Sequence, residues 1–232
     1  MKPKDLHHLE KQLSVTFKNV ELLKNAFIHR SYLNENKHAE FQSNEKLEFL
    51  GDSVLSLITS VYLYKHYPKF KEGDYTEIKS AIVKTGSLAD AALELKLGDY
   101  LYVSKGEELG NGRKNKNILA DCFEAVIAAI FLDLGYDAAD EFVVRYLFKD
   151  VLDRTIKEGE YLSSKSKLQE LAQATYKTIP NYKVVSEEGP EHRRIFTIAA
   201  YINKKKYGLG IGFSKKEAEE IAAKKTLEVL EK

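Results

Sequence analysis

The sequence contains one cysteine, Cys122, among its 232 residues. A single cysteine excludes an internal disulfide framework and any zinc site that needs several thiolate ligands. This composition fits a protein that works in a reducing compartment. The N-terminal segment, MKPKDLHHLEKQL, also lacks the apolar core of a signal peptide. We therefore expect a cytoplasmic location.

The sequence also lacks a long hydrophobic run. Its longest uninterrupted apolar stretch covers residues 125–132, whereas a helix that spans a bilayer needs about 20 apolar residues. We therefore expect no membrane association. A phosphate-binding glycine loop and a nucleophilic-serine elbow are both missing from the sequence, so we expect no nucleotide cofactor and no serine hydrolase. Several histidines lack metal-ligand spacing and are interpreted as surface or capping residues: His7, His8, His29, His38 and His66.

The net charge of +1 hides an uneven distribution along the chain. Residues 1–155 carry 21 basic and 24 acidic side chains, which gives a net charge of −3. Residues 156–232 carry 15 basic and 11 acidic side chains, which gives a net charge of +4. A chain of this length has room for one or two domains with a core. The mildly basic second part favours a polyanionic partner.

Three carboxylates share one face of a predicted helix in the segment NEKLEFLGDSVL, residues 44–55. At 100° per residue, Glu45, Glu48 and Asp52 fall within a stripe about 60° wide, opposite an apolar stripe that faces the core. Neighbouring acids repel, and Gly51 inside the same helix costs about 1 kcal/mol relative to alanine. This unfavourable arrangement suggests an external partner for the acids, most simply a divalent cation. A solvated acidic face is the alternative.

A second acidic face occurs in the segment NILADCFEAVIAAIFLDLG, which begins at Asn117. Asp121 and Glu124 are three residues apart on one side of the predicted helix, beside a strongly apolar run. In apolar surroundings, two carboxylates cost less free energy with a partner group than without one. The preceding stretch, residues 103–117, is rich in glycine, asparagine and lysine, so we expect a long loop that can contribute to binding.

The boundaries of the acidic helix follow from proline and capping residues. Pro68 predicts an end near Tyr67. Asp74 is predicted to cap the next helix, with Glu77 three residues later, in a variant of the capping box. This assignment leaves Glu72 just outside that helix.

The periodicity changes after a short polar segment, residues 156–163, which reads as a linker. A helix is predicted over 165–176, followed by strands over 182–188, 194–202 and 206–213. Ser214 and Glu217 form a capping box that opens a final helix to Leu230. The second domain is therefore expected to have the order α-β-β-β-α.

Five motifs together resemble bacterial ribonuclease III over nearly the whole chain. They are NEKLEFLGDSVL at 44–55, ILADCFEAVIAAIFLD at 118–133, KLQELAQ at 167–173, GPEH at 189–192 and SKKEAEEIAAKKTL at 214–227. The resemblance implies an all-α endonuclease and dimerisation domain over 1–155. A linker over 156–163 and a small α+β double-stranded-RNA-binding domain over 164–232 complete the expected architecture.

The resemblance also assigns roles to the acids. It implies that Glu48, Asp121 and Glu124 are metal ligands and that Asp52 acts with Glu124 in catalysis. Accessory acids near the cleavage site map onto Glu45 and Glu72. Clustered oxygen ligands suit Mg²⁺, with Mn²⁺ able to take its place.

The partners implied by the resemblance are a second copy of the chain and duplex RNA. Phe49 is expected to insert into the partner subunit of a homodimer. The RNA-binding residues are expected to be Gln169, His192, Lys215 and Lys216. Glu219 stands where the family often has a basic residue, so we expect weaker affinity and a shallower salt dependence.

Two functions are compatible with this architecture. The first is a metal-dependent endoribonuclease that cuts double-stranded RNA, leaves 5′-phosphate and 3′-hydroxyl ends with short 3′ overhangs, and serves ribosomal RNA processing and mRNA or small-RNA maturation and decay. The second is a non-cleaving protein of the same fold that only binds double-stranded RNA. Loss of cleavage would be expected to leave gaps among the acids, and all six are present. The sequence therefore predicts the enzyme.

Overall fold

The computed structural model describes residues 5–37, 41–149, 152, 155–156, 159, 161–190 and 193–230. The chain divides into two compact units, residues 1–158 and 159–232, and the division falls within the predicted linker. Each unit is described by itself.

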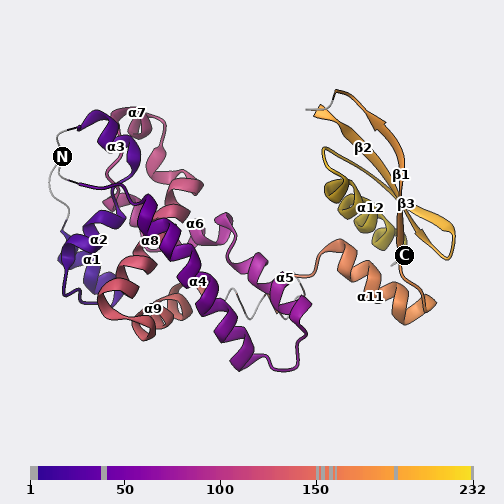
Figure 1. Cartoon of the computed structure of the whole chain (residues 1–232), viewed down its shortest axis with the longest axis horizontal. Coiled ribbons are helices and arrows are strands. Elements are labelled where there is room, and N and C mark those ends of the chain that lie inside the picture. The colour runs from indigo at the N-terminus through magenta and orange to yellow at the C-terminus, as the bar shows by residue number, and fades with distance from the viewer. Residues whose placement is uncertain are drawn as a thin grey trace. The chain divides into compact units, whose positions relative to one another are not determined.

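Unit 1 is helical, and Figure 1 shows its helices arranged around α4 and α8. Its elements are α1 (Leu6–Leu13), α2 (Val20–Ala26), α3 (Arg30–Glu35), α4 (Glu45–His66), α5 (Glu72–Ile82), α6 (Thr85–Glu94), η1 (Leu97–Tyr100), α7 (Lys105–Leu109), η2 (Gly112–Lys114), α8 (Lys116–Leu134), α9 (Tyr136–Val143) and η3 (Val144–Phe148). Within the described part of this unit, the β-type pairing is a single bridge between Ile28 and Tyr102. The predicted all-α class of the first domain is confirmed.

Helix α8 forms the centre of unit 1. Residues 125–130 of this helix are all fully buried, because α2, α4, α6 and α9 pack around it. An apolar run without alternation is the pattern expected for a helix that is covered on every side. Among the described residues, α4 is long and apolar enough by length and composition to cross a membrane. It packs along α8 and carries three acids in its first half, which indicates a core helix instead.

Gly51 sets the distance between α4 and α8. A β-carbon at this position would lie 1.9 Å from the main-chain oxygen of Glu124, so only glycine allows the two helices to approach this closely. The sequence suggested that the cost of Gly51 reflects an external partner for the acids. The structure corrects this interpretation, because the close helix crossing accounts for the glycine.

The short stretch between α2 and α3 is not helical, because it pairs with the chain that follows η1. The amide of His29 donates to the oxygen of Tyr102 at 3.1 Å, and the amide of Tyr102 donates to Phe27 at 2.8 Å. Asn44, which is buried, holds the start of α4 against this segment. Its amide donates to the oxygen of Ile28 at 2.8 Å, and its side chain donates to Ala26.

The start of α5 corrects the predicted cap. The helix begins at Glu72, and the carboxylate of Asp74 accepts a bond of 2.8 Å from the amide of Lys71. Asp74 is therefore the third residue of the helix in a capping box, and Glu72 lies in the first turn. The sequence identified Asp74 as a capping residue but placed it at the N-cap. The N-cap is Lys71, and Asp74 bonds to its backbone amide from inside the helix.

The predicted loop over 103–117 is largely folded. It contains α7 and η2, and Ser104 caps α7 by accepting from the amide of Glu107 at 3.1 Å. The guanidinium of Arg113 donates to the carbonyls of Gly98 and Leu101 and to the carboxylate of Glu108. These bonds fix the segment that leads into α8, so it is a structured support for the acidic helix.

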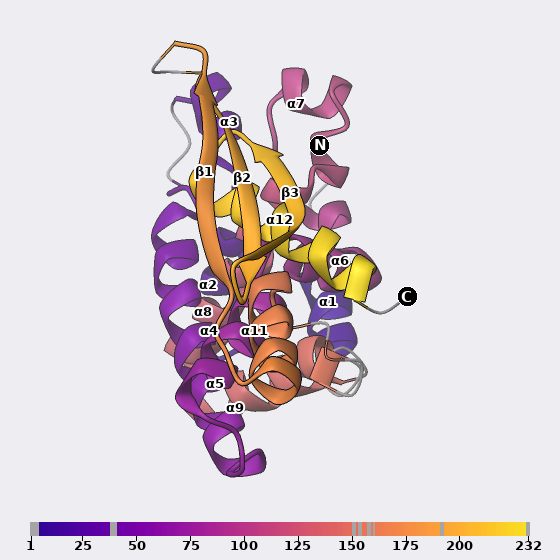
Figure 2. The ribbon, with the colours of Figure 1, turned by 90° about the vertical axis from the view of Figure 1, so that its right-hand side faces the viewer.

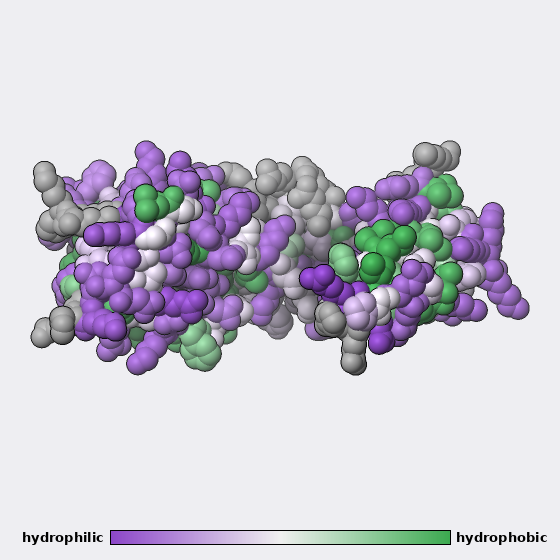
Figure 3. Space-filling view, turned by 90° about the horizontal axis from the view of Figure 1, so that it is seen from above, coloured by the Kyte–Doolittle hydropathy of each residue, from purple (hydrophilic) through white to green (hydrophobic). Residues whose placement is uncertain are grey.

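Unit 2 has the predicted order of elements. It consists of α11 (Ser164–Tyr176), β1 (Asn181–Glu188), β2 (Ile195–Ile202), β3 (Lys205–Gly212) and α12 (Lys215–Leu230). The strands form an antiparallel sheet in the order β1-β2-β3, and Figure 2 shows them side by side with α12 on one face. Leu168, Ala200 and Ala222 belong to the core between the helices and the sheet. Among the described residues of unit 2, no helix covers the other face of the sheet, which is called the open face. Figure 3 shows hydrophobic residues gathered on the surface of this unit.

Candidate active site

Three carboxylates from two separate helices meet in unit 1. Glu48 projects from α4, and Asp121 and Glu124 project from α8. One carboxylate oxygen of each residue lies within 4.8 Å of one oxygen of the other two, and all three residues are half-buried. The arrangement depends on the close crossing at Gly51, because the main chain of Glu124 touches α4 there.

The electrostatics of this acidic cluster, Glu48, Asp121 and Glu124, are unfavourable without a cation. Burial, assisted by Asp52, Asp121 and Glu48, raises the pKa of Glu124 to about 8. Burial and the neighbouring acids also raise the pKa of Glu48. Burial raises the pKa of Asp121, whereas His29 and Arg30 act in the opposite direction. Three oxygen ligands that repel one another at this spacing fit a hard divalent cation such as Mg²⁺.

Two further acids lie at the margin of the cluster. Asp52 is exposed, one turn after Glu48 on α4, and its charge acts on Glu124. Glu45 is also exposed; its carboxylate accepts from the hydroxyl of Ser43 at 2.7 Å and lies 3.6 Å from the guanidinium of Arg30. Both acids are therefore accessible from solvent, and their charges act on the cluster.

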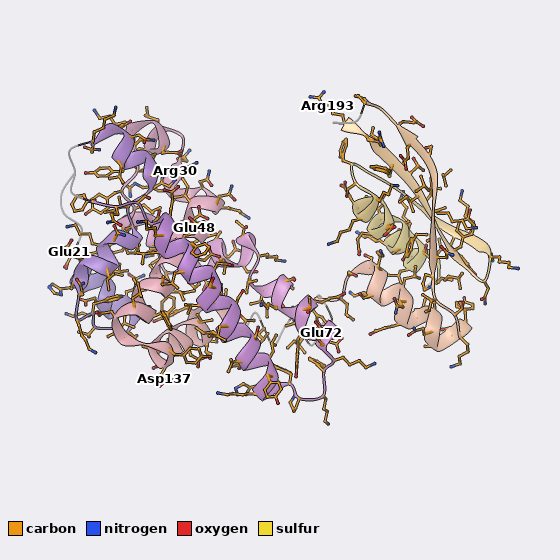
Figure 4. All side chains as sticks on the ribbon, viewed as in Figure 1. Glu21, Arg30, Glu48, Glu72, Asp137 and Arg193 are labelled. Carbon is orange, nitrogen blue, oxygen red and sulfur yellow. The ribbon has the colours of Figure 1, made fainter. Side chains whose placement is uncertain are left out.

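Glu72 is not brought to this cluster. Glu48 is in the first turn of α4, whereas Glu72 follows the opposite end of that helix, and 18 residues of helix span about 27 Å. Figure 4 labels both residues and shows them well separated. The carboxylate of Glu72 accepts a local bond from Thr76 at 3.1 Å. Within one copy of the chain, Glu72 does not contribute to the site.

Two residues near the cluster were not predicted to belong to the site. Arg30 opens α3 and pairs with Glu45, and Figure 4 labels it near Glu48. His29 is the N-cap of α3, in agreement with its interpretation as a surface or capping residue. Its ring lies 2.7 Å from the hydroxyl of Ser31. Burial lowers the pKa of His29. No sequence spacing links these residues to the acids, because the contact arises only when Asn44 holds α4 against this segment.

The predicted RNA-binding residues lie in unit 2. Gln169 is exposed on α11, and Lys215 and Lys216 are exposed at the start of α12. Lys215 pairs with Glu187 at 3.1 Å. His192 lies outside the described residues. Glu219, the departure from the family pattern, forms an ion pair with Lys165 of α11, so its negative charge is offset locally.

The raised pKa of Glu124 predicts a stability that depends on pH and on metal. Its ordinary value is 4.5 and its value in the folded chain is about 8. Folding therefore favours the protonated form, and this contribution to stability is complete below about pH 4.5 and lost as the pH rises through about 8. We expect the unfolding temperature in EDTA to fall between pH 6 and 9, and saturating Mg²⁺ to reduce that fall. Thermal unfolding measured in EDTA and in Mg²⁺ tests this prediction. Unfolding temperatures that change with pH in the same way in both buffers would contradict it.

Two family profiles match the chain. The family described as Ribonuclease-III-like matches residues 19–151, and the double-stranded RNA binding motif matches residues 164–230. A relative from Dehalococcoides mccartyi (strain ATCC BAA-2266 / KCTC 15142 / 195), named Ribonuclease 3, is 44% identical over 227 residues, which cover 98% of this chain and 95% of the relative. A Ribonuclease 3 from Clostridium botulinum (strain Eklund 17B / Type B) is 45% identical over 224 residues, covering 97% and 95%.

A solved structure supports the same assignment. The nuclease domain of ribonuclease III from Campylobacter jejuni, described for flexibility in a region involved in dimer formation, is 36% identical with a TM-score of 0.59. The alignment covers 63% of this chain and 99% of that domain. These matches confirm the resemblance found in the sequence and the two-domain fold class. The chain therefore belongs to the ribonuclease III family and is an endonuclease with a double-stranded-RNA-binding domain.

Proposed function

We propose that the cluster of Glu48, Asp121 and Glu124 holds Mg²⁺, or Mn²⁺ in its place, and is the site at which the chain hydrolyses double-stranded RNA. The observation that supports this most directly is the meeting of the three carboxylates from α4 and α8. Bound there, the cation would lower the pKa of a water molecule and stabilise the charge that develops on the leaving oxygen. The products are 5′-phosphate and 3′-hydroxyl ends with short 3′ overhangs.

The protein's own residues orient the reaction. Glu48 and Asp121 act as ligands, while Glu124 combines a ligand role with a catalytic one. Asp52 acts on the attacking water or the leaving group; its exposure and the effect of its charge on Glu124 support this role. Glu45 lies at the solvent side as an accessory acid. Because Glu72 is remote from the cluster of its own copy, its accessory role belongs to the dimer.

The proposed dimer brings two such sites to one duplex. A two-fold dimer places two copies of the cluster across the RNA, so each copy cuts one strand. Phe49 supports this arrangement, because 78% of its surface is exposed on α4, beside the acids. Aromatic residues are enriched among the residues that contribute most to the binding energy of interfaces, which favours Phe49 as a subunit contact.

Replacement of Phe49 should weaken the dimer. Burial of a phenylalanine side chain in a partner is worth about 3 kcal/mol or more. A two-fold dimer buries Phe49 twice, once in each partner, so we expect Phe49→Ala to raise the dissociation constant of the dimer roughly 10⁴-fold, as measured by sedimentation equilibrium. Leu109→Ala is the control, because Leu109 is 88% exposed on α7. Equal dimer stability in both variants would show that Phe49 is not at the interface.

Unit 2 is proposed to hold the duplex by its shape. The wide minor groove of A-form RNA presents 2′-hydroxyls. The family resemblance assigns contacts with these hydroxyls to Gln169 and His192. Lys215 and Lys216 lie at the N-terminus of α12, where the helix dipole also favours phosphate. Such binding is largely independent of sequence. We propose that the chain acts on ribosomal RNA precursors and other structured RNAs, and that it does so in the cytoplasm.

Cleavage of a long RNA duplex tests the proposed function. We expect fragments with 5′-phosphate and 3′-hydroxyl ends in Mg²⁺, similar products in Mn²⁺, and intact duplex in EDTA. End-group analysis distinguishes these products from those of a nuclease that leaves 3′-phosphates. Retention of the duplex without cleavage under every metal condition would favour the non-cleaving RNA-binding protein.

A further inference from the structure

Unit 2 has a cavity of about 660 Å³ that none of the proposed roles uses. Its lining residues come from the loop before β1, from β1 and β2, and from the turn between β2 and β3: Thr178, Ile179, Asn181, Lys183, Tyr201, Asn203 and Lys204. In the sheet register Asn181 pairs with Tyr201, whereas Tyr182 pairs with Ala200 in the core. Because side chains alternate along a strand, Asn181 and Tyr201 lie on the open face of the sheet.

The cavity lies at the opposite end of the sheet from Lys215 and Lys216. The antiparallel order places the β2–β3 turn at one end of the sheet and the β1–β2 connection, with the start of α12, at the other end. Figure 1 shows these two ends of the strands. A strand of eight residues is about 25 Å long. A duplex held by Lys215 and Lys216 therefore leaves the cavity available to another ligand.

The lining of the cavity has the chemistry of a nucleotide site. Lys183 and Lys204 supply two positive charges, and none of the described residues that line the cavity is acidic. The ring of Tyr201 and the side chain of Ile179, which is 62% exposed, offer apolar surfaces for a base. Asn181, like the other amide and hydroxyl groups of the lining, can bond to base or ribose edges. The ammonium of Lys183 lies over the Tyr201 ring, 5.3 Å from its centre, so the positive charge and the aromatic ring lie next to each other in the cavity.

Lys204 stands at a position of the β2–β3 turn where glycine would carry less steric cost. Asn203 and Lys204 both have positive φ, 49° and 66°, and they form a two-residue hairpin loop. Such a loop strongly favours Asn-Gly, because glycine adopts positive φ without the steric cost that a β-carbon adds. Lysine at the second position keeps that cost and places a positive charge at the rim of the cavity.

We propose that this cavity, at the β2–β3 end of the open sheet face, binds an unpaired nucleotide through its base and phosphate. The base contacts Tyr201 and Ile179, and the phosphate is neutralised by Lys183 and Lys204. The nucleotide can come from a single-stranded segment that flanks a duplex or from free nucleotide. The inference goes beyond the proposed function, because binding here requires neither a metal nor cleavage.

Binding by the full chain in EDTA tests the proposal without cleavage. Fluorescence anisotropy compares a blunt RNA duplex with the same duplex carrying an unpaired 3′ tail, and AMP is the free-nucleotide probe. We expect the wild-type chain to bind the tailed duplex at least threefold more tightly, or to bind AMP directly. The first result assigns the site to unpaired RNA and the second to free nucleotides. Failure to distinguish the duplexes together with failure to bind AMP would overturn the proposal.

Lys204→Gly is the decisive variant, because it removes the charge and relieves the turn, so it should unfold at the same temperature or higher. We expect this variant to lose the preference for the tailed duplex, or the binding of AMP, and to keep its affinity for the blunt duplex. Lys177→Gly is the matched control: Lys177 also has positive φ, 53°, and is exposed, but it does not line the cavity. Identical losses in both variants, or an equal loss of blunt-duplex binding in Lys204→Gly, would overturn the assignment. Displacement of the tail by hexaglutamate but not by AMP would also overturn it, in favour of an acidic peptide.

Discussion

Glu124→Gln should abolish cleavage of double-stranded RNA and leave duplex binding intact. The amide keeps the size of the side chain but removes one of the three charges that would hold the cation at the proposed site. Loss of that charge should lower the rate at least roughly 1000-fold, because a bound metal contributes several kcal/mol to the stabilisation of the transition state. Single-turnover cleavage in Mg²⁺ and a gel-shift assay in EDTA measure the two properties separately.

Glu94→Gln is the control for this substitution. Glu94 is exposed at the end of α6, so the same chemical change there should alter neither property. A second readout uses the pKa of Glu124. Because the neutral amide avoids ionisation of a half-buried acid, Glu124→Gln should raise the unfolding temperature in EDTA at pH 9 but not at pH 5. Near-normal cleavage by Glu124→Gln would show that the site is assigned to the wrong acid.

Gly51→Ala should destabilise unit 1 and open the acidic cluster. The added methyl group would lie 1.9 Å from the oxygen of Glu124, in main chain that cannot move without shifting α8. We expect a loss of about 3 kcal/mol in the free energy of unfolding, at the upper end of the range for overpacked cores. The unfolding temperature should fall by about 5–10 °C. Because α4 and α8 would separate, the affinity for Mn²⁺, measured by calorimetry, should also fall.

Gly73→Ala provides the matched control. Gly73 lies inside α5, and a β-carbon there meets nothing within 4 Å. Alanine is the better helix former, so this variant should be more stable by up to about 1 kcal/mol and should bind metal normally. If Gly51→Ala behaved like Gly73→Ala, the close crossing of α4 and α8 would not be what determines the geometry of the cluster.

Much of the fold could be predicted because the relevant signals are local. The apolar stripe of α4, the uninterrupted apolar run of α8 and the alternation in β2 each indicate an element from a few neighbouring residues. The starts of elements were less predictable. The N-cap of α5 is Lys71, which is not a typical capping residue, so the start of the helix at Glu72 was not predicted. Residues 103–117 looked like a loop because α7 and η2 are stabilised by the distant contacts of Arg113.

The candidate site was predictable in its residue types but not in its geometry. The sequence placed Glu48 on one helical face and Asp121 and Glu124 on another, and only the resemblance to the family brought these faces together. Arg30 was missed because its contact with Glu45 joins segments that have no common periodicity. Glu72 was grouped with the other acids, although within one copy of the chain it lies beyond the far end of α4.

The sequence by itself determined the order of the two domains, the identity of the acids and the helical faces that carry them, because helix periodicity is encoded within a few turns. Only the tertiary structure decided that these faces meet within 4.8 Å, that Gly51 is required for the meeting and that Glu124 carries a raised pKa. Distance and burial are properties of contacts between segments far apart in the chain. They arise only when packing brings the helices together and excludes water from the acids.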